Sequence, residues 1–203
     1  MIDPRIYLAS RSPRRRELLT QIGVRFDLLL FRTPPRDDHE VNEAWLPGEV
    51  PEAYVQRVAR AKAVFGAGLI ARREIVARPV LAADTTLDLD GEIIGKPRDE
   101  DDAAAILARL SGRTHRVLTA VAMARAERIE HRLSISEVRF RELTAAEIRR
   151  YVHSSEPMDK AGAYGIQGRA AMFIEEIRGS HSGIVGLPLC ETTLLLREFG
   201  YPL

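Results

Sequence analysis

The chain has 203 residues, of which 45% are hydrophobic and 29% are charged, and its formal net charge at pH 7 is +1. A chain of this length and composition can bury a substantial core and is typical of soluble globular proteins. The nearly balanced charge excludes the broad basic field that nucleic-acid binders use, so positive charge matters only where it clusters.

The cysteine content and the hydropathy exclude two further classes of protein. Cys190 is the single cysteine, so the chain has no internal disulfide and no cysteine-based metal site. No apolar run approaches the roughly 20 residues of a membrane span, and residues 1–4 are too short and polar for a signal peptide. We therefore expect a cytoplasmic protein without a membrane partner.

The first predicted elements are a strand and a helix. Residues 6–9 form an apolar run typical of a buried strand, and Ser12 followed by Pro13 marks a helix start, with Gly23 at the helix end. Three arginines at positions 14–16 then fall in the first helical turn, where the helix dipole favours acidic residues. This unfavourable choice indicates a phosphate site at the helix N-terminus; a solvated basic patch is the alternative.

A second strand and a long helix follow. Residues 26–31 predict the strand, and the polar, proline-bearing residues 32–49 predict an exposed loop with several carboxylates. Pro51 opens a helix whose apolar stripe is predicted to be Val55, Val58, Ala59, Lys62 and Phe65. The lysine either extends along the surface to reach water or places its ammonium group in a cleft, and the spacing does not separate these alternatives.

The next segment predicts a strand that ends in polar residues. Residues 80–83 read as buried, and Asp84 and Thr85 follow at the predicted C-terminal end, where α/β proteins meet their ligands. Residues 90–91, Asp-Gly, indicate a hairpin. Just after the returning strand, a glycine and a proline flank Lys96 and limit the positions that it can take.

The C-terminal half alternates strands and helices. The predicted elements are a helix over 99–110, strands over 115–123, 129–140, 170–177 and 183–185, and helices over 144–151 and 188–199. His115 is expected to be a hydrogen-bonded strand residue, because no second histidine stands at ligand spacing. The glycines of residues 162–168 lack the spacing of a nucleotide-binding fingerprint and predict a tight loop with its backbone near a ligand.

Seven motifs, spread in order along nearly the whole chain, resemble those of the Maf-like nucleoside triphosphate pyrophosphatases. They are LASRSPRR at 8–15, VNEAWLPGE at 41–49, ARAKA at 59–63, AADTT at 82–86, GKP at 95–97, LSGRTH at 110–115, and DKAGAYGIQG at 159–168 with VGLPLCET at 185–192. One departure is Asn42, which stands where an aspartate is common, after a loop that is longer and richer in proline than usual.

The resemblance implies a fold and a reaction. The fold is a two-lobed α/β structure with a mixed sheet and a central cleft, similar to inosine triphosphate pyrophosphatases, formed by one domain over residues 1–203 and commonly a homodimer. The reaction is hydrolysis between the α and β phosphates of a nucleoside triphosphate, in a nucleotide-pool housecleaning role. Such chemistry needs cations, a divalent metal such as Mg²⁺, Mn²⁺ or Co²⁺, and a carboxylate that orients or deprotonates water.

The same resemblance implies a role for each site residue. Asp84 is expected to be the catalytic base or to position a metal-bound water, and Glu43 and Asp84 are expected to hold the metal. The residues expected to bind substrate are Ser10, Arg14, Arg15, Lys62, Thr85, Lys96 and Gln167.

Three of these positions bear on which base is recognised. Arg14, Thr85 and Gln167 match the branch of the family that hydrolyses dTTP and UTP, with CTP or modified pyrimidine nucleotides as further options. The branch acting on 7-methyl-GTP has an aromatic residue, a serine and a glutamate there. A neutral glutamine can both donate to and accept from the polar edge of a pyrimidine.

Two other classes of function are weighed against the enzyme. A phosphate-binding regulatory module affecting cell division would need the arginines but not the carboxylates. A nucleic-acid-binding protein would need a wider basic surface and aromatic side chains for stacking, whereas this chain has one tryptophan. We therefore expect a nucleoside triphosphate substrate and no nucleic-acid partner.

Overall fold

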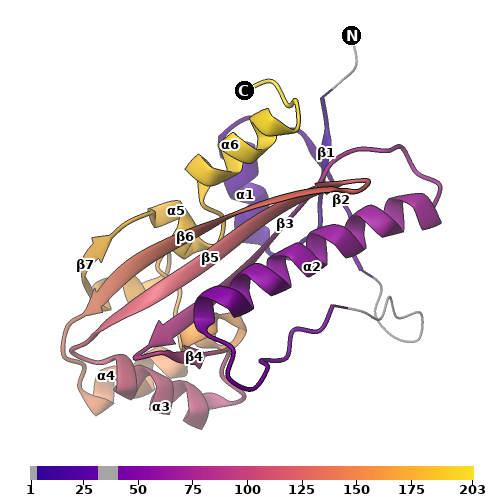
Figure 1. Cartoon of the computed structure of the whole chain (residues 1–203). Coiled ribbons are helices and arrows are strands. Elements are labelled where there is room, and N and C mark those ends of the chain that lie inside the picture. The colour runs from indigo at the N-terminus through magenta and orange to yellow at the C-terminus, as the bar shows by residue number, and fades with distance from the viewer. Residues whose placement is uncertain (1–3, 32–40) are drawn as a thin grey trace.

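The computed structural model describes residues 4–31 and 41–203, which form a mixed α/β fold on a seven-stranded sheet (Figure 1). The strands are β1 (Ile6–Leu8), β2 (Phe26–Leu28), β3 (Val80–Leu89), β4 (Glu92–Ile94), β5 (Thr114–Arg125), β6 (Arg128–Phe140) and β7 (Ile174–Arg178). Their order is β2-β1-β3-β5-β6-β7, with β4 paired to β3 outside this path. β1 is parallel to β2 and β3, and the other pairs are antiparallel, which confirms the mixed sheet.

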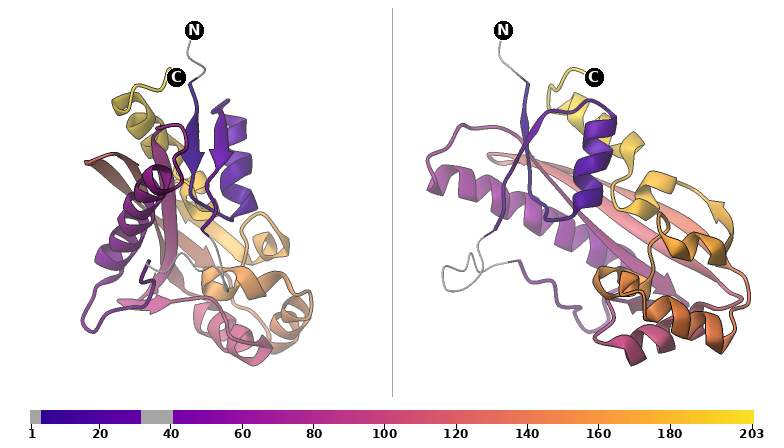
Figure 2. Two further views of the ribbon diagram at one scale, coloured as in Figure 1. Left: turned by 90° about the vertical axis from the view of Figure 1, so that its right-hand side faces the viewer. Right: turned by 180° about the vertical axis from the view of Figure 1, so that it is seen from behind.

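Helices cover both faces of the sheet and one end of it. The α-helices are α1 (Pro13–Gln21), α2 (Pro51–Arg72), α3 (Glu100–Leu110), α4 (Ala145–Val152), α5 (His181–Val185) and α6 (Leu189–Glu198). Three 3₁₀ helices join them, η1 (Glu156–Asp159), η2 (Ala161–Ala163) and η3 (Arg169–Phe173). α2 runs along one face, α1 and α6 lie on the other, and α3 and α4 lie at the end of the sheet remote from the N-terminus (Figures 1 and 2).

The side chains of β3 alternate between two cores, because successive residues of a strand point to opposite faces. Leu81 and Ala83 belong to the core under α1 and α6, and Val80 belongs to the core under α2. Gly66 lets α2 approach closely, since a Cβ there would lie 2.8 Å from Cγ1 of Val80. This alternation decides which helix each later residue of β3 faces.

β3 does not end at residue 83, which corrects the predicted strand end. On one edge β5 pairs with it from Val80 to Asp88. On the other edge β1 pairs with residues 80–81 and β4 with residues 87–89. Residues 82–86 of β3 therefore have no strand partner on that edge within the described ranges. The sheet is notched there, and Asp84 lies in the middle of the strand.

Two other predictions from apolar runs are wrong in part. Residues 183–185 form the end of helix α5 and not a strand, because Oγ of Ser180 caps the helix by accepting from the N–H of Gly183 at 3.0 Å. The predicted strand over 170–177 begins only at Ile174, after η3. Short apolar runs do not by themselves separate helix from strand.

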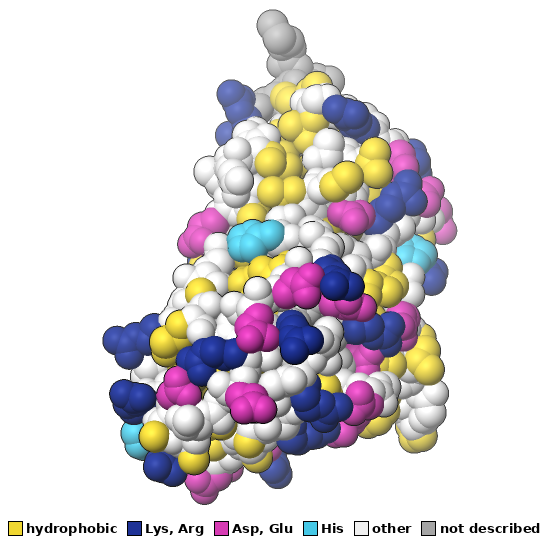
Figure 3. Space-filling model, turned by 90° about the vertical axis from the view of Figure 1, so that its left-hand side faces the viewer, with side chains coloured by type: hydrophobic (Ala, Val, Ile, Leu, Met, Phe, Trp, Pro, Cys, Tyr) yellow, Lys and Arg dark blue, Asp and Glu magenta, His cyan; other side chains and the backbone are white. Residues whose placement is uncertain are grey.

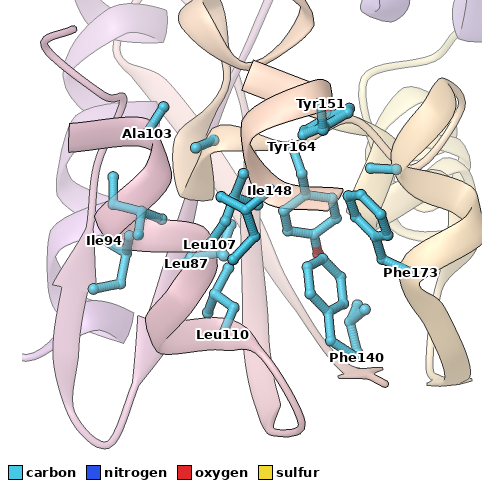
Figure 4. Close-up of a cluster of buried hydrophobic side chains, with 14 of the residues drawn as sticks. Leu87, Ile94, Ala103, Leu107, Leu110, Phe140, Ile148, Tyr151, Tyr164 and Phe173 are labelled. Carbon is cyan, nitrogen blue, oxygen red and sulfur yellow. The ribbon is translucent and has the colours of Figure 1, made fainter. Parts of the chain in front are cut away.

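The core at the end of the sheet is rich in aromatic rings (Figure 4). The ring of Tyr164 lies 4.8 Å from that of Phe140 and 5.5 Å from that of His115, measured between centroids. Nε2 of His115 lies 2.8 Å from the Tyr164 hydroxyl, which confirms a hydrogen-bonded strand residue. Burial lowers the pKa of His115 to about 4.

His115 is expected to make the fold sensitive to acid. Its pKa falls from 6.5 in the unfolded chain to about 4 in the fold, so between these values the unfolded chain binds more protons. The contribution of His115 to the free energy of unfolding is therefore fully present above pH 6.5. It decreases by roughly 3 kcal/mol as the pH falls to 4. Urea unfolding at several pH values should show that His115→Gln, which cannot titrate, lacks this part of the decrease. Parallel curves for variant and wild type would contradict the assignment.

Candidate active site

A cleft of about 1200 Å³ opens at the notch in the sheet. Its walls come from the turn before α1, from α2 and β3, and from the glycine-rich loop around η2. All nine residues predicted for the site line it: Ser10, Arg14, Arg15, Glu43, Lys62, Asp84, Thr85, Lys96 and Gln167. Six of the seven motifs are thus brought together in one place, whereas LSGRTH at 110–115 does not line the cleft. The role of each site residue stays a prediction.

Asp84, Lys62 and Glu43 form the charged centre of the cleft. The alternation along β3 turns Asp84 toward α2, where Nζ of Lys62 lies 2.9 Å from its Oδ1. The same Nζ lies 2.9 Å from Oε2 of Glu43. The side chain of Lys62 is only 14% exposed, so of the two alternatives its ammonium group lies in the cleft. Two carboxylates thereby converge on one cation.

The two carboxylates fit a hard divalent cation. Among the described residues, no three His, Cys, Asp or Glu side chains gather into a complete metal site. Mg²⁺, however, is commonly held by one or two carboxylates together with substrate phosphates and water. Asp84 and Glu43, which already meet at one positive charge, supply that share of oxygen ligands and offer nothing to a soft metal.

Arg15 connects three parts of the chain. Its Nε donates to the carbonyl of Gly186 at 2.8 Å, and Nη1 donates to the carbonyl of Ala83 at 2.8 Å. Nη1 also donates to Oγ of Ser10, and Nη2 to Oγ1 of Thr85, each at 3.3 Å. Four of the five N–H groups of the guanidinium are therefore used within the protein. Arg15 fixes the turn before α1 to β3 and to the residue after α5.

Other predicted binding residues present accessible side chains. Lys96 and Gln167 are exposed at the rim of the cleft, and Arg14 is partly buried there. Thr85 differs, because its hydroxyl accepts from Arg15 and lies 3.0 Å from that of Thr119. Thr85 is consequently placed to hold Arg15, whereas Arg14, Lys96 and Gln167 are placed to meet a ligand.

Lys160, which is not among the site residues predicted from the sequence, lines the same cleft. Its Nζ donates to the carbonyl of Glu156 at 2.6 Å and pairs with Asp159. Protein side chains also fill the space beside the glycines of this loop. A Cβ on Gly165 would lie 2.9 Å from Cε of Lys160, and one on Gly168 would lie 2.1 Å from Oε1 of Glu156. Close packing against Lys160 and Glu156 therefore explains why positions 165 and 168 are glycines. The lysine within the motif DKAGAYGIQG was the sequence feature that could have identified Lys160 as a site residue.

Comparison with known proteins places the chain among relatives that match it over nearly their whole length. The family described as Maf-like protein matches residues 5–199. The dTTP/UTP pyrophosphatase of Dechloromonas aromatica (strain RCB) is 61% identical over 197 residues, covering 97% of this chain and 98% of that protein. The protein of the same name from Aromatoleum aromaticum (strain DSM 19018 / LMG 30748 / EbN1) is 64% identical over 203 residues, covering 100% and 98%.

Among solved structures, that of the Staphylococcus aureus Ham1 protein matches with a TM-score of 0.48 and 13% identity, covering 96% of this chain and 97% of that one. A likeness at this level carries no weight here. The family assignment rests on the match to the family over residues 5–199 and on the two relatives above 60% identity. The chain belongs to the Maf-like protein family.

Proposed function

We propose that this chain is a nucleoside triphosphate pyrophosphatase that hydrolyses dTTP and UTP to the monophosphate and pyrophosphate. The observation that carries the proposal is the meeting of Asp84, Glu43 and Lys62 in a cleft that several further cations line. A triphosphate with about four negative charges requires such cations, and attack by water requires a carboxylate. The dTTP/UTP pyrophosphatases at 61% and 64% identity support the choice of substrate.

In this proposal Asp84 accepts the proton of the attacking water, and Asp84 and Glu43 hold a divalent cation. Mg²⁺, Mn²⁺ or Co²⁺, when bound, supplies charge neutralisation at the reacting phosphate. Lys62 keeps the two carboxylates together, because its Nζ lies 2.9 Å from one oxygen of each. Arg14 and Lys96 bind phosphate oxygens. Arg15 and Ser10 shape the phosphate end of the cleft.

The nucleobase of the substrate is recognised at the rim of the cleft. Gln167 is exposed there and can donate to and accept from the edge that thymine and uracil share. Thr85 acts at the phosphate end instead, because its hydroxyl accepts from Nη2 of Arg15. A glutamate at position 167 would instead suit a cationic purine.

The surface charge and the hydropathy of the helices bear on the partners and the location of the protein. On the face drawn in Figure 3, basic and acidic side chains are interspersed, which favours a protein without a nucleic-acid partner. Within the described ranges, no helix combines the length and the apolar character that a bilayer span requires. A homodimer remains an expectation from the resemblance, and a cytoplasmic location remains an expectation from the cysteine content and the hydropathy. A regulatory phosphate-binding module is the weaker alternative, because it has no use for the paired carboxylates.

A panel of nucleotides tests the proposal. Pyrophosphate release is measured with canonical ribonucleotides, deoxyribonucleotides and 7-methyl-GTP, each with Mg²⁺, Mn²⁺ or Co²⁺ and with excess EDTA. We expect dTTP and UTP to rank first, with the single methyl group that separates thymine from uracil worth about 1 kcal/mol in transition-state binding. EDTA should abolish turnover, and Gln167→Glu should lower the preference for pyrimidines.

Each arm of this experiment has an outcome that contradicts the proposal. An unchanged substrate ranking in Gln167→Glu would contradict the role of that residue. Preference for 7-methyl-GTP would refute the substrate, and full turnover in EDTA would remove the metal from the reaction. No pyrophosphate release from any nucleotide would favour the regulatory module.

A further inference from the structure

The loop that carries Glu43 is irregular, yet two side chains of α2 hold its backbone. Nη1 of Arg57 donates to the carbonyl of Asn42 at 2.8 Å, and Nη2 donates to that of Ala44 at 2.9 Å. Between them, the hydroxyl of Tyr54 donates to the carbonyl of Glu43 at 3.1 Å. Residues three apart on a helix share one face, so a single face of α2 binds three consecutive carbonyls.

Arg57 is itself held in place. Its Nε and Nη2 bind Oε1 and Oε2 of Glu49 at 2.6 and 2.8 Å, in a bidentate pair. The side chain of Glu49 is 9% exposed, and Arg57 keeps the pKa of its carboxyl below the usual value. Burial, together with the nearby Asp84, raises the pKa of Tyr54 to about 12, so its hydroxyl stays a donor. We call Arg57, Tyr54 and Glu49 the loop clasp.

The loop clasp restricts the backbone around Glu43, whose own side chain is weakly held. That side chain is 56% exposed, and its ion pair is with Lys62. An exposed ion pair contributes little to the free energy of a conformation, and a mobile glutamate loses entropy when it is fixed. Fixing the carbonyls on both sides of Glu43 limits where its carboxylate can go. The ion pair with Lys62 then selects among few positions.

We propose that Arg57 is a positioning residue for hydrolysis, acting through Glu43 by holding the backbone on either side of it. Arg57 does not line the cleft, whereas Glu43 and Tyr54 do. Its effect on the reaction must therefore pass through the loop. The inference rests on the function proposed above, and specifically on the metal-binding or water-orienting role of Glu43.

A double-mutant cycle between Arg57→Ala and Glu43→Gln tests this. Arg57→Ala should lower kcat by about 10- to 100-fold and change the nucleotide KM by less than about threefold, because Arg14 and Lys96 are retained. In the double variant, kcat should fall no further than in Glu43→Gln alone. Arg60→Ala, an exposed arginine of the same helix, is the matched control and should match wild type.

A second readout does not depend on turnover. Trp45 is the single tryptophan of the chain, and its Nε1 donates to the carbonyl of Glu49 at 2.7 Å, within the same loop. Arg57→Ala should shift Trp45 emission to longer wavelength and increase its quenching by acrylamide, with an unchanged far-UV circular dichroism spectrum. Arg57→Lys should resemble Arg57→Ala, because an ammonium group cannot bind two carbonyls and a carboxylate as a guanidinium does.

The outcomes separate this inference from the proposed function. Additive losses in the double variant, or a wild-type kcat in Arg57→Ala beside a defective Glu43→Gln, would overturn the positioning role alone. Wild-type turnover in Glu43→Gln would refute the role of Glu43 and with it the inference. If Arg57→Ala does not fold, Tyr54→Phe takes its place in the cycle, because it removes one hydrogen bond to a loop carbonyl and keeps the ring. Its effect on kcat should show the same non-additivity with Glu43→Gln, at a smaller size.

Discussion

Asp84→Asn is expected to lower kcat for pyrophosphate release by about 10²- to 10⁴-fold while the fold is retained. Asparagine has nearly the same shape as aspartate, and its amide oxygen can still accept from Nζ of Lys62, which lies 2.9 Å from Oδ1. The amide cannot accept a proton from water, and it is a weaker ligand for a divalent cation. The reaction should therefore suffer far more than the stability.

A buried aspartate of the same strand provides the matched control. Asp88 lies four residues further along β3, pairs with Arg116 and accepts from the N–H of Gly91, and it is not among the residues that line the cleft. Asp88→Asn should lower the free energy of unfolding and leave kcat within about threefold of wild type. Steady-state kinetics at saturating nucleotide and metal, with circular dichroism, make the comparison. Turnover of folded Asp84→Asn within about tenfold of wild type would contradict the assignment of Asp84.

The sequence predicted which residues meet in the cleft better than it predicted how each is held. The polar residues after residue 83 look like the end of a strand, yet β3 continues because β5 pairs with it as far as Asp88. For a related reason, helical spacing could not decide whether the ammonium group of Lys62 reaches solvent or lies in the cleft. Only the register of β3 shows that Asp84 faces α2, so no local pattern could decide between solvent and cleft.

The loop clasp was beyond sequence reasoning for a different reason. Arg57 binds carbonyls 13 and 15 positions earlier in the chain. Every residue except proline offers the same backbone donor and acceptor, so the sequence does not show which carbonyls a surface arginine will reach. Patterns of side chains predicted the core of α2 correctly, since Val55, Val58 and Ala59 are buried. Contacts to irregular backbone require the folded structure.

The second large effect is expected on stability, from Arg15→Ala. The change leaves the carbonyls of Gly186 and Ala83 without the donors that lie 2.8 Å away, and it disconnects the turn before α1 from β3. An unsatisfied, partly buried acceptor costs about 1–3 kcal/mol, so the free energy of unfolding should fall by roughly 3 kcal/mol. Burial lowers the pKa of Arg15, and the nearby Asp84 opposes this shift.

The neighbouring arginine is the control for this prediction. Arg16 is exposed on α1, and Arg16→Ala should change the free energy of unfolding by less than about 0.5 kcal/mol. Arg15→Lys should recover little, because an ammonium group cannot reproduce four hydrogen bonds in the geometry of a guanidinium. Urea unfolding at pH 7 measures all three variants. If Arg15→Ala unfolds like wild type but raises the nucleotide KM strongly, Arg15 is a phosphate ligand and not a structural connection between α1, β3 and α5.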